Sequence, residues 1–142
     1  MKRNRSIPTP PVVPVLIYPD VRQAVAWLEE VFGFAERLQI GEAHRSQMTY
    51  RDGALIVADV RHSQVAPTPG QVTSVVLLRV EDVDAVFERA IAAGSTVVHE
   101  PHTWEYGERQ ATIDDYAGHR WTLSQTVADA DPAEWGGQLK QP

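Results

Sequence analysis

Trp104, Tyr106 and Arg109 are the residues whose types and spacing best suit the binding of a small molecule. They lie within the segment HTWEYGER, which starts at residue 102 and has no periodic apolar pattern, so we expect a loop there. An exposed loop has no packing reason to carry two large aromatic side chains and a guanidinium so close together. We therefore expect these side chains to line a ligand site. Two alternatives stay open: the rings close over the sheet as a local core, or they meet a second subunit.

The strand after the next turn is expected to add polar groups to this site. Residues 116–118 form a turn, and after it Trp121 and Leu123 alternate with polar residues, which is typical of a strand with one packed face. We place Trp121 and Leu123 in the core. The polar face is predicted to point into a cleft and consists of Arg120, Thr122 and Ser124.

Acidic residues can add negative charge to the same site. Asp59 lies two residues beyond Val57, and Val57 matches Thr122 because each follows a turn glycine by four residues. Since alternate residues of a strand share a face, Asp59 is expected on the face that Thr122 occupies. Glu105 lies within the aromatic loop. The carboxylate pairs at 105/108 and 114/115 can each share a proton, but we expect solvated side chains on loops.

The histidines are not expected to bind a metal. His99 and His102 occur in HEPH, where Pro101 prevents the helix on which a metal-binding HExxH pair would lie. We expect both to be exposed loop residues. His119 follows the turn glycine and is expected to hydrogen-bond the turn backbone, with a role as general base as the alternative.

Two similar series of secondary-structure elements position these residues. The first has a strand over 12–18, a helix from Val21 that is capped by Asp20 and ended by Gly33, and strands over 34–40, 44–50 and 54–60. Pro14 is compatible with the first strand only at a sheet edge or beside a bulge. The second has a strand over 72–80, a helix after Asp82 that Gly94 closes, a strand from residue 95, and the hairpin around residues 116–118.

The two series have the same order and a nearly constant offset, which indicates an internal duplication. Asp20, Gly33 and Gly53 match Asp82, Gly94 and Gly118. A module of roughly 50 residues buries too little apolar surface to be stable alone. We therefore predict an α+β fold in which tandem β-α-β-β-β modules, residues 12–60 and 72–126, form a curved mixed sheet with a central cleft. Residues 61–71 are the expected linker, 1–11 a disordered tail, and 127–142 a C-terminal tail that is either loose or held by Trp135.

Composition excludes several classes of function. Without cysteine there are no disulfides and no thiolate chemistry. The net charge of -6, with clustered basic residues only in the first five positions, argues against a nucleic-acid partner. No apolar run reaches the roughly 20 residues that span a bilayer, and prolines follow the charged start in place of a signal segment. We expect a cytoplasmic protein without a membrane partner.

The duplicated arrangement resembles the vicinal oxygen chelate superfamily, which includes glyoxalase I, extradiol dioxygenases, fosfomycin resistance enzymes and bleomycin resistance proteins. The resemblance covers about residues 12–126, and the glyoxalase-like and bleomycin-resistance-like branch fits best. The closing turn is similar to the family's Asp-Pro-x-Gly-His pattern, with Tyr116 in place of the proline. The segments that carry the resemblance are PVLIYPDVRQAVAWLEEVFGF, LLRVEDVDAVFERAIAAGSTVV and DDYAGHRWTL.

The family's metal ligands are absent from the matching positions. In the family, His or Gln early in the first strand of each module and Glu in the last strand hold the metal. The matching residues here are Val13 or Pro14, Val57, Val75 or Val76, and Thr122. These residues lack the donor groups that Zn²⁺, Fe²⁺ or Mn²⁺ require, so we expect no metal and no cofactor.

The resemblance implies a protein that binds a small molecule, such as a drug or an antibiotic, and acts by sequestration. The first rival is a glyoxalase-like lyase or isomerase that uses Asp59, Glu105 or His119 as a general base. The second rival is a metal-dependent enzyme such as a dioxygenase, which would require a different register in both modules. Family members resembling this chain are commonly homodimers, so we also expect a homodimer.

Overall fold

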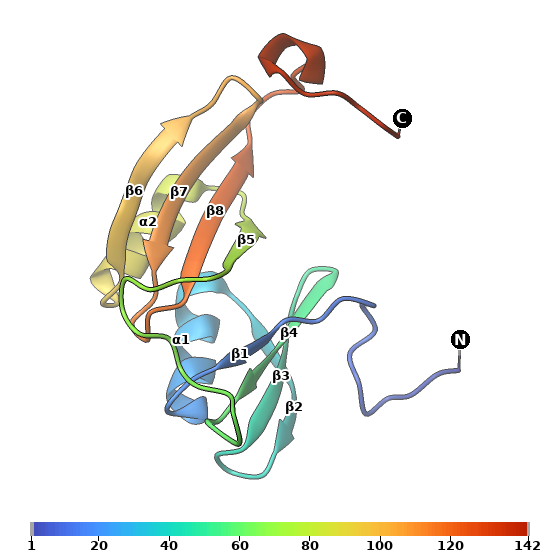
Figure 1. The fold of residues 1–142 in the computed structure, drawn as a ribbon, viewed down its shortest axis with the longest axis vertical. Helices are drawn as coiled ribbons and strands as arrows, with labels where there is room; N and C mark the ends of the chain where they lie inside the picture. The colour runs from blue at the N-terminus through green and yellow to red at the C-terminus, as the bar shows by residue number, and fades with distance from the viewer. Residues whose placement is uncertain (1, 142) are drawn as a thin grey trace. The chain divides into compact units, whose positions relative to one another are not determined.

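The computed structural model describes residues 2–141, and the chain separates into two compact units, Met1–Gln71 and Val72–Pro142. Each unit has the element order β-α-β-β-β and builds its own four-stranded mixed sheet (Figure 1). The predicted α+β class and the duplicated β-α-β-β-β order are therefore confirmed. The two units are described separately below.

The first unit contains one helix, α1 (Val21–Phe32), which lies along one face of its sheet. Its strands are β1 (Val15–Ile17), β2 (Ala35–Ile40), β3 (Arg45–Tyr50) and β4 (Gly53–Ala58). The sheet order is β1-β4-β3-β2, in which only the β1–β4 pair is parallel. β1 is thus an edge strand, and Pro14 directly precedes it, as the sequence requires.

The second unit repeats this plan with α2 (Val83–Ala92). Its strands are β5 (Val75–Arg79), β6 (Thr96–Thr103), β7 (Glu108–Asp114) and β8 (Arg120–Thr126). The sheet order is β5-β8-β7-β6, again with one parallel pair, β5–β8. A short 3-10 helix, η1 (Pro132–Trp135), follows the last strand.

Both helices begin at the predicted aspartates. The Asp20 carboxylate accepts a hydrogen bond from the backbone N–H of Gln23 at 3.0 Å, and Asp82 accepts one from that of Ala85 at 3.1 Å. Each bond satisfies a backbone donor that lacks a partner within the helix. Gly33 ends α1 in the left-handed conformation, with φ 81°.

The helix-facing side of each sheet forms the core of its unit. In the second unit Trp121 and Leu123 are fully buried, which confirms their predicted core position. Ile113 and Ala111 of β7 are buried with them, and α2 contacts β6, β7 and β8. The side chains that alternate with these residues lie on the opposite face, which α2 does not cover.

The predicted loop around Trp104 is shorter than expected. β6 continues through Pro101 to Thr103 and β7 begins at Glu108, so only residues 104–107 connect the strands. β6 tolerates the proline because it is an edge strand with register shifts on either side of His99. His99 and His102 are exposed, but they lie on a strand, and the loop assignment for them was wrong.

The register between the modules also differs by one residue from the predicted match. Val57 pairs with Leu16 and is fully buried, and its partner on β3, Ser46, hydrogen-bonds Glu36, which is bonded to Arg22 of α1. Val57 therefore faces the helix and does not correspond to Thr122. Counting four residues from each turn glycine gave the wrong match. Gly53 is already part of β4, whereas Gly118 precedes β8 by two residues.

Among residues 2–141, no helix is long and apolar enough to cross a membrane.

Candidate functional site

The face of the second sheet that α2 leaves uncovered is lined by polar side chains. It is built from alternate residues of β6, β7 and β8, because the register places these residues side by side. The residues of this polar face are His99, His102, Glu108, Gln110, Thr112, Asp114, Arg120, Thr122 and Ser124.

A chain of hydrogen bonds orders the end of this polar face that is nearest the turn between β6 and β7. The Tyr106 hydroxyl donates to Gln110 Oε1 at 2.8 Å, the Gln110 amide donates to Ser124 Oγ at 3.0 Å, and Ser124 donates to Glu108 Oε1 at 2.7 Å. Every donor in the chain points toward the Glu108 carboxylate. Gln110 and Ser124 are each bonded on both sides, so the acceptor to which the Tyr106 hydroxyl donates is itself held in place.

A hollow of about 100 Å³ lies next to this chain. The Thr112 and Thr122 hydroxyls, which form a hydrogen bond with each other at 3.1 Å, both belong to its lining. Its volume equals roughly three water molecules, so it has room for one ring or substituent of a larger ligand. Its lining is aromatic and neutral polar, and consists of His99, Trp104, Gln110, Thr112 and Thr122.

Aromatic rings gather at the end of the sheet where β6 turns into β7. Trp104 and Tyr106 are parallel within 4°, with centroids 6.1 Å apart, and the His102 ring meets Trp104 edge-on at 4.4 Å. Trp135 of the C-terminal segment contacts Tyr106 at 5.3 Å. The two loop aromatics therefore pack on each other and on the tail, while Trp104 also lines the hollow.

Asp114 and Asp115 are buried, which corrects the expectation of solvated loop carboxylates. They are 8% and 3% exposed. Arg120 donates to both oxygens of Asp114, at 2.8 and 3.1 Å, and Asp114 is in turn the main cause that raises the pKa of Arg120. Asp115 accepts from the backbone N–H groups of Ala117 and His119, both at 3.0 Å, and from the Trp121 indole at 3.1 Å. Asp115 was predicted to be a solvated loop residue. Its carboxylate instead holds the turn together.

Arg109, which was predicted to line the ligand site, is engaged on the helix-facing side of the sheet and is not part of the polar face. It donates to both carboxylate oxygens of Asp84 on α2, at 2.8 and 2.9 Å, and to Thr103 at 3.1 Å. The hydrogen bond from Arg109 is the main cause that holds the pKa of Asp84 below its usual value.

Asp59 belongs to the first unit and does not take part in the polar face. Its carboxylate accepts from Arg61 Nε at 2.8 Å and lies 2.9 Å from His44 Nδ1. These contacts, the Arg61 hydrogen bond first, keep the pKa of Asp59 below its usual value. A carboxylate with this arrangement is a weak proton acceptor.

The remaining predicted residues have simpler surroundings. Glu105 is exposed in the turn between Trp104 and Tyr106. The His119 backbone is bonded to Asp115 in both directions, since its N–H donates to the Asp115 side chain and its carbonyl accepts from the Asp115 N–H at 2.8 Å. Burial, with a smaller contribution from Glu108, raises the pKa of Tyr106, so its hydroxyl stays protonated.

The corrected register does not restore the family's metal ligands. The residue on the uncovered face of β4 that matches Thr122 is Ile56, because Val57 pairs with Leu16 as Leu123 pairs with Leu78. Neither Ile56 nor Thr122 offers a carboxylate. Among residues 2–141, no three His, Asp or Glu side chains come together in a way that could hold a metal ion.

Three residues that line the hollow were missed from the sequence. Gln110 and Thr112 alternate with buried Ala111 and Ile113, so the two-residue period of ERQATID was an available signal. His99 gave no such signal, because the bulges in β6 break its alternation.

Two consecutive β-α-β-β-β units, each with a helix on one face of a mixed sheet, define a recognised class of proteins. The model of the Glyoxalase/Bleomycin resistance protein/Dioxygenase superfamily matches residues 12–123. The chain therefore belongs to this superfamily, as the sequence resemblance indicated.

Several solved structures share the fold. TioX from Micromonospora sp. ML1 is 30% identical with a TM-score of 0.65, and the match covers 82% of this chain and 99% of TioX. A glyoxalase/bleomycin resistance protein/dioxygenase family enzyme from Burkholderia phytofirmans PsJN is 17% identical, with a TM-score of 0.67 and coverage of 80% and 95%. The bleomycin resistance determinant encoded on transposon Tn5 is 19% identical, with a TM-score of 0.62 and coverage of 84% and 100%.

Two mycobacterial proteins are similar over a shorter segment. Uncharacterized protein Mb0911c of Mycobacterium bovis is 42% identical over 57 residues, which is 40% of this chain and 38% of that protein. Uncharacterized protein Rv0887c of Mycobacterium tuberculosis gives the same identity over 40% of this chain and 34% of its own length. The match thus spans little more than a third of these curated relatives.

Proposed function

We propose that the protein binds a flat small molecule on the polar face of its second unit and acts by sequestering it. The observation that carries this proposal is the hollow beside Trp104, whose lining combines aromatic rings with neutral hydrogen-bonding groups. Ligand sites are typically apolar and aromatic surfaces with a few oriented polar groups. One ring of the ligand would fill the hollow, and the remainder would lie against Trp104.

The charge of the second unit favours a cationic ligand. This unit holds twelve of the chain's 19 Asp and Glu residues but only five of its 13 Lys and Arg residues. Two of these arginines form ion pairs within the unit. Arg109 pairs with Asp84, and Arg120 pairs with Asp114. Aromatic faces attract cations at about 6 Å, which adds to the preference.

Binding without chemistry is supported by the state of the acidic groups. The carboxylates of Glu108 and Asp114 accept hydrogen bonds from neighbouring side chains, and none of the residues around the hollow is Asp or Glu. The Tn5 protein is a bleomycin resistance determinant, and by likeness of fold we propose a drug or an antibiotic as the ligand class here.

A fluorescence titration tests the proposal. A planar cation such as an aminoacridine should quench tryptophan emission of the purified protein saturably, because it stacks on Trp104. Trp104→Ala should lose the quench and about tenfold in affinity, which corresponds to about 1.4 kcal/mol. Trp27→Phe, which removes a tryptophan of α1 instead, should bind as the unaltered protein does.

Three results would contradict the proposal. Equal affinity of Trp104→Ala and the unaltered protein would remove Trp104 from the site. Binding of a planar anion such as a naphthalene sulfonate, without binding of the cation, would show that the acidic surface does not set selectivity. Consumption of the bound molecule would indicate an enzyme in place of a sequestering protein.

A further inference from the structure

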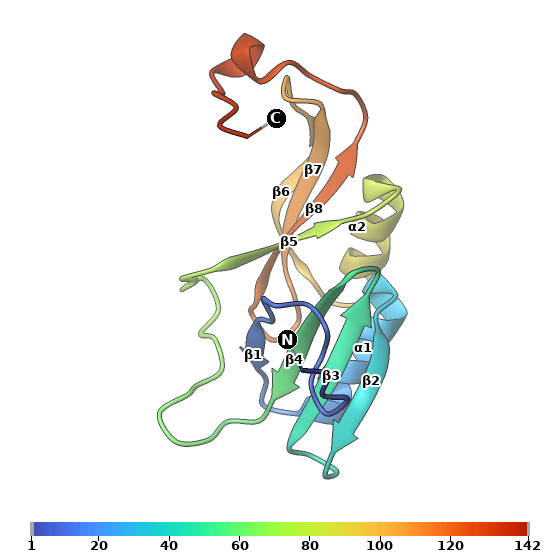
Figure 2. The ribbon, with the colours of Figure 1, turned by 90° about the vertical axis from the view of Figure 1, so that its right-hand side faces the viewer.

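Residues 4–13, here called the N-terminal strap, lie across the face of the first sheet that α1 does not cover (Figure 2). Val13 packs against an apolar cluster on this face, formed by Ile17, Ile56 and Ala58. Farther along the strap Pro8 is buried. The strap is therefore anchored on the sheet at two separate places.

Two side chains of the sheet hold the strap through its backbone. Arg37 of β2 donates to the carbonyl of Arg5 at 2.8 Å, and Gln47 of β3 donates to the carbonyl of Ser6 at 2.8 Å. Arg37 also donates to Gln47 Oε1 at 2.5 Å, which orients the carboxamide. Gln47 is only 2% exposed. Side chains of the sheet thus bind two consecutive backbone carbonyls of the strap. These two hydrogen bonds do not depend on the identity of the strap's side chains.

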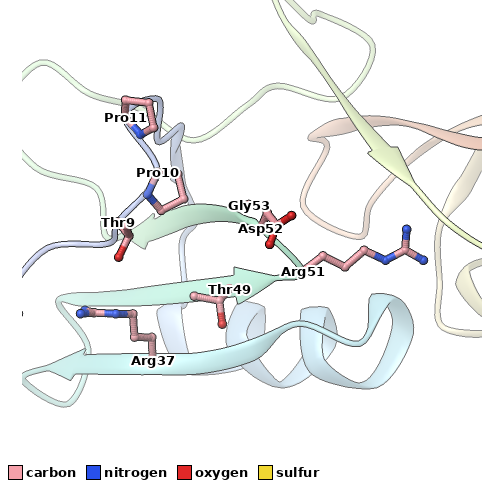
Figure 3. Close-up of a pocket in the computed structure, with 8 residues that line it drawn as sticks. All are labelled: Thr9, Pro10, Pro11, Arg37, Thr49, Arg51, Asp52 and Gly53. Atoms are coloured by element: carbon pink, nitrogen blue, oxygen red, sulfur yellow. The ribbon is translucent and has the colours of Figure 1, made fainter.

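The middle of the strap arches over a hollow of about 440 Å³. Figure 3 shows residues 9–11 on one side of it and the turn between β3 and β4 on the other. Arg37 and Arg51 extend in opposite directions from this region, so they do not form a joint anion site. A segment needed only to complete the core would be expected to pack closely along its length. This segment is instead held at its ends.

We propose that this face of the first unit is a second binding face, which takes proline-containing peptide segments that turn and bend as residues 5–11 of the strap do, and that the strap is its displaceable occupant. The ligand needs two consecutive backbone carbonyls that accept hydrogen bonds from Arg37 and Gln47. It also needs a proline two residues after the second carbonyl, and an apolar residue that packs on the cluster of Ile17, Ile56 and Ala58. Proline-containing segments bind readily because the fixed φ of proline leaves the free peptide fewer conformations to lose. This face belongs to the first unit, whereas the polar face described above belongs to the second.

An external peptide must compete with the tethered strap. A short tether holds the strap at an effective concentration on the order of millimolar, so a free copy displaces it only in comparable excess. Displacement breaks the hydrogen bonds that hold the carbonyls of Arg5 and Ser6 on the sheet, so trypsin can then bind this segment and cut the bond between the two residues. Cleavage of the full chain at this bond therefore reports whether the strap is bound.

The first experiment measures trypsin cleavage after Arg5 by mass spectrometry, with cleavage after exposed Lys140 as the internal reference. The competitor is a peptide of residues 4–13 with Arg5→Gln, which trypsin does not cut and which keeps the backbone carbonyls. At a few millimolar it should speed cleavage after Arg5 by about threefold or more. The same peptide with Pro8→Asp should have no effect, and cleavage after Lys140 should not change.

The variant Gln47→Ala should speed cleavage after Arg5 in the full chain without any peptide, by about fivefold or more, because one carbonyl contact is lost. The proposal is overturned if the peptide leaves the cleavage rate unchanged, or if Arg5 is cut as fast as Lys140 in the unaltered protein.

The second experiment uses the full chain with Pro8→Asp in its own strap, which leaves Arg37, Gln47 and the apolar cluster in place. It should bind the Arg5→Gln peptide, labelled with a fluorophore, at least about tenfold more tightly than the unaltered protein does. Adding Gln47→Ala should abolish this gain. Equal binding by all three proteins would overturn the proposal, and if Pro8→Asp does not fold, the cleavage experiment decides alone.

Discussion

Single buried polar residues define the shape of the last hairpin. Asp115 accepts three hydrogen bonds while it is 3% exposed, so one carboxylate joins the turn backbone to the indole of the core residue Trp121. Leaving a buried donor without a partner costs more free energy than the hydrogen bond itself contributes. The hairpin that carries Arg120, Thr122 and Ser124 thus depends on a residue outside the ligand site.

Asp115→Asn is expected to lower the free energy of unfolding by about 2 kcal/mol, because the new amide cannot accept all three hydrogen bonds. Urea denaturation followed by circular dichroism measures the change. Asp52→Asn is the control, since Asp52 is exposed in the turn between β3 and β4. Equal midpoints for the two variants would show that Asp115 is not needed for the turn.

At the scale of the secondary-structure elements, the turn between β6 and β7 depends on the tail that follows β8. The Gly107 carbonyl accepts from the N–H groups of Val127 and Ala128, at 2.9 and 3.3 Å. Trp135 then contacts Tyr106. The C-terminal segment therefore lies against the turn between β6 and β7, through the backbone hydrogen bonds of Gly107 and the contact of Trp135 with Tyr106.

Gly107→Ala should detach this tail. Gly107 has φ 86°, and an added Cβ would clash with the backbone carbonyl of Ala128. We expect faster hydrogen exchange at residues 127 and 128 and altered Trp135 fluorescence. Gly94→Ala is the matched control, because Gly94 has φ 97° but open space around it.

Both glycine variants should lose about 1 kcal/mol from backbone strain. Only Gly107→Ala should change hydrogen exchange in the tail. The same exchange pattern in both variants would mean that the tail is not packed on Gly107.

The link between α1 and β2 should make the first unit sensitive to acid. Arg22 donates to both oxygens of Glu36, at 2.7 and 2.9 Å, and this bond is the main cause that lowers the pKa of Glu36. A carboxylate whose pKa is lower in the folded state stabilises the fold above its unfolded pKa. That stabilisation is lost as the pH falls through the folded pKa.

Glu36→Gln is therefore expected to be about 1 kcal/mol less stable than the unaltered protein at pH 7, because the partly exposed ion pair is lost. The difference should shrink as the pH falls from 5 to 3. Urea denaturation at a series of pH values tests this, with Glu30→Gln of α1 as the exposed control. A difference that is independent of pH would exclude the ion pair as its source.

At the scale of the whole molecule, each unit leaves apolar residues exposed on an edge strand. Val75 and Leu77 of β5 are 50% and 56% exposed, and Val15 of β1 is 42% exposed. Edge strands with exposed apolar residues promote association between chains. These exposed edges favour the homodimer that the family resemblance leads us to expect.

Sedimentation at micromolar concentrations should give twice the chain mass of 15.8 kDa. Leu77→Arg should shift the protein toward the monomer, because it places a charge on the β5 edge. Val65→Arg, at an exposed position between the two modules, should leave the dimer intact. A single 15.8 kDa species for the unaltered protein would rule the dimer out.

The sequence alone determined the duplicated architecture and its helices, because capping and amphipathic periodicity act over a few residues. Asp20, Asp82 and Gly33 each identified a helix end, and the alternation around Trp121 identified a strand with one buried face. These signals depend on neighbours in the chain and need no knowledge of what packs against them.

Only the tertiary structure decided which residues meet. The partner of Arg109 is Asp84, 25 residues away, and Gln47 binds the backbone of Ser6, 41 residues away. The face on which Val57 lies depended on whether a turn glycine belongs to the strand, since a shift of one residue reverses the side of the sheet. Ion pairs, hydrogen-bond partners and strand register are set by long-range packing, for which a single sequence carries no local signal.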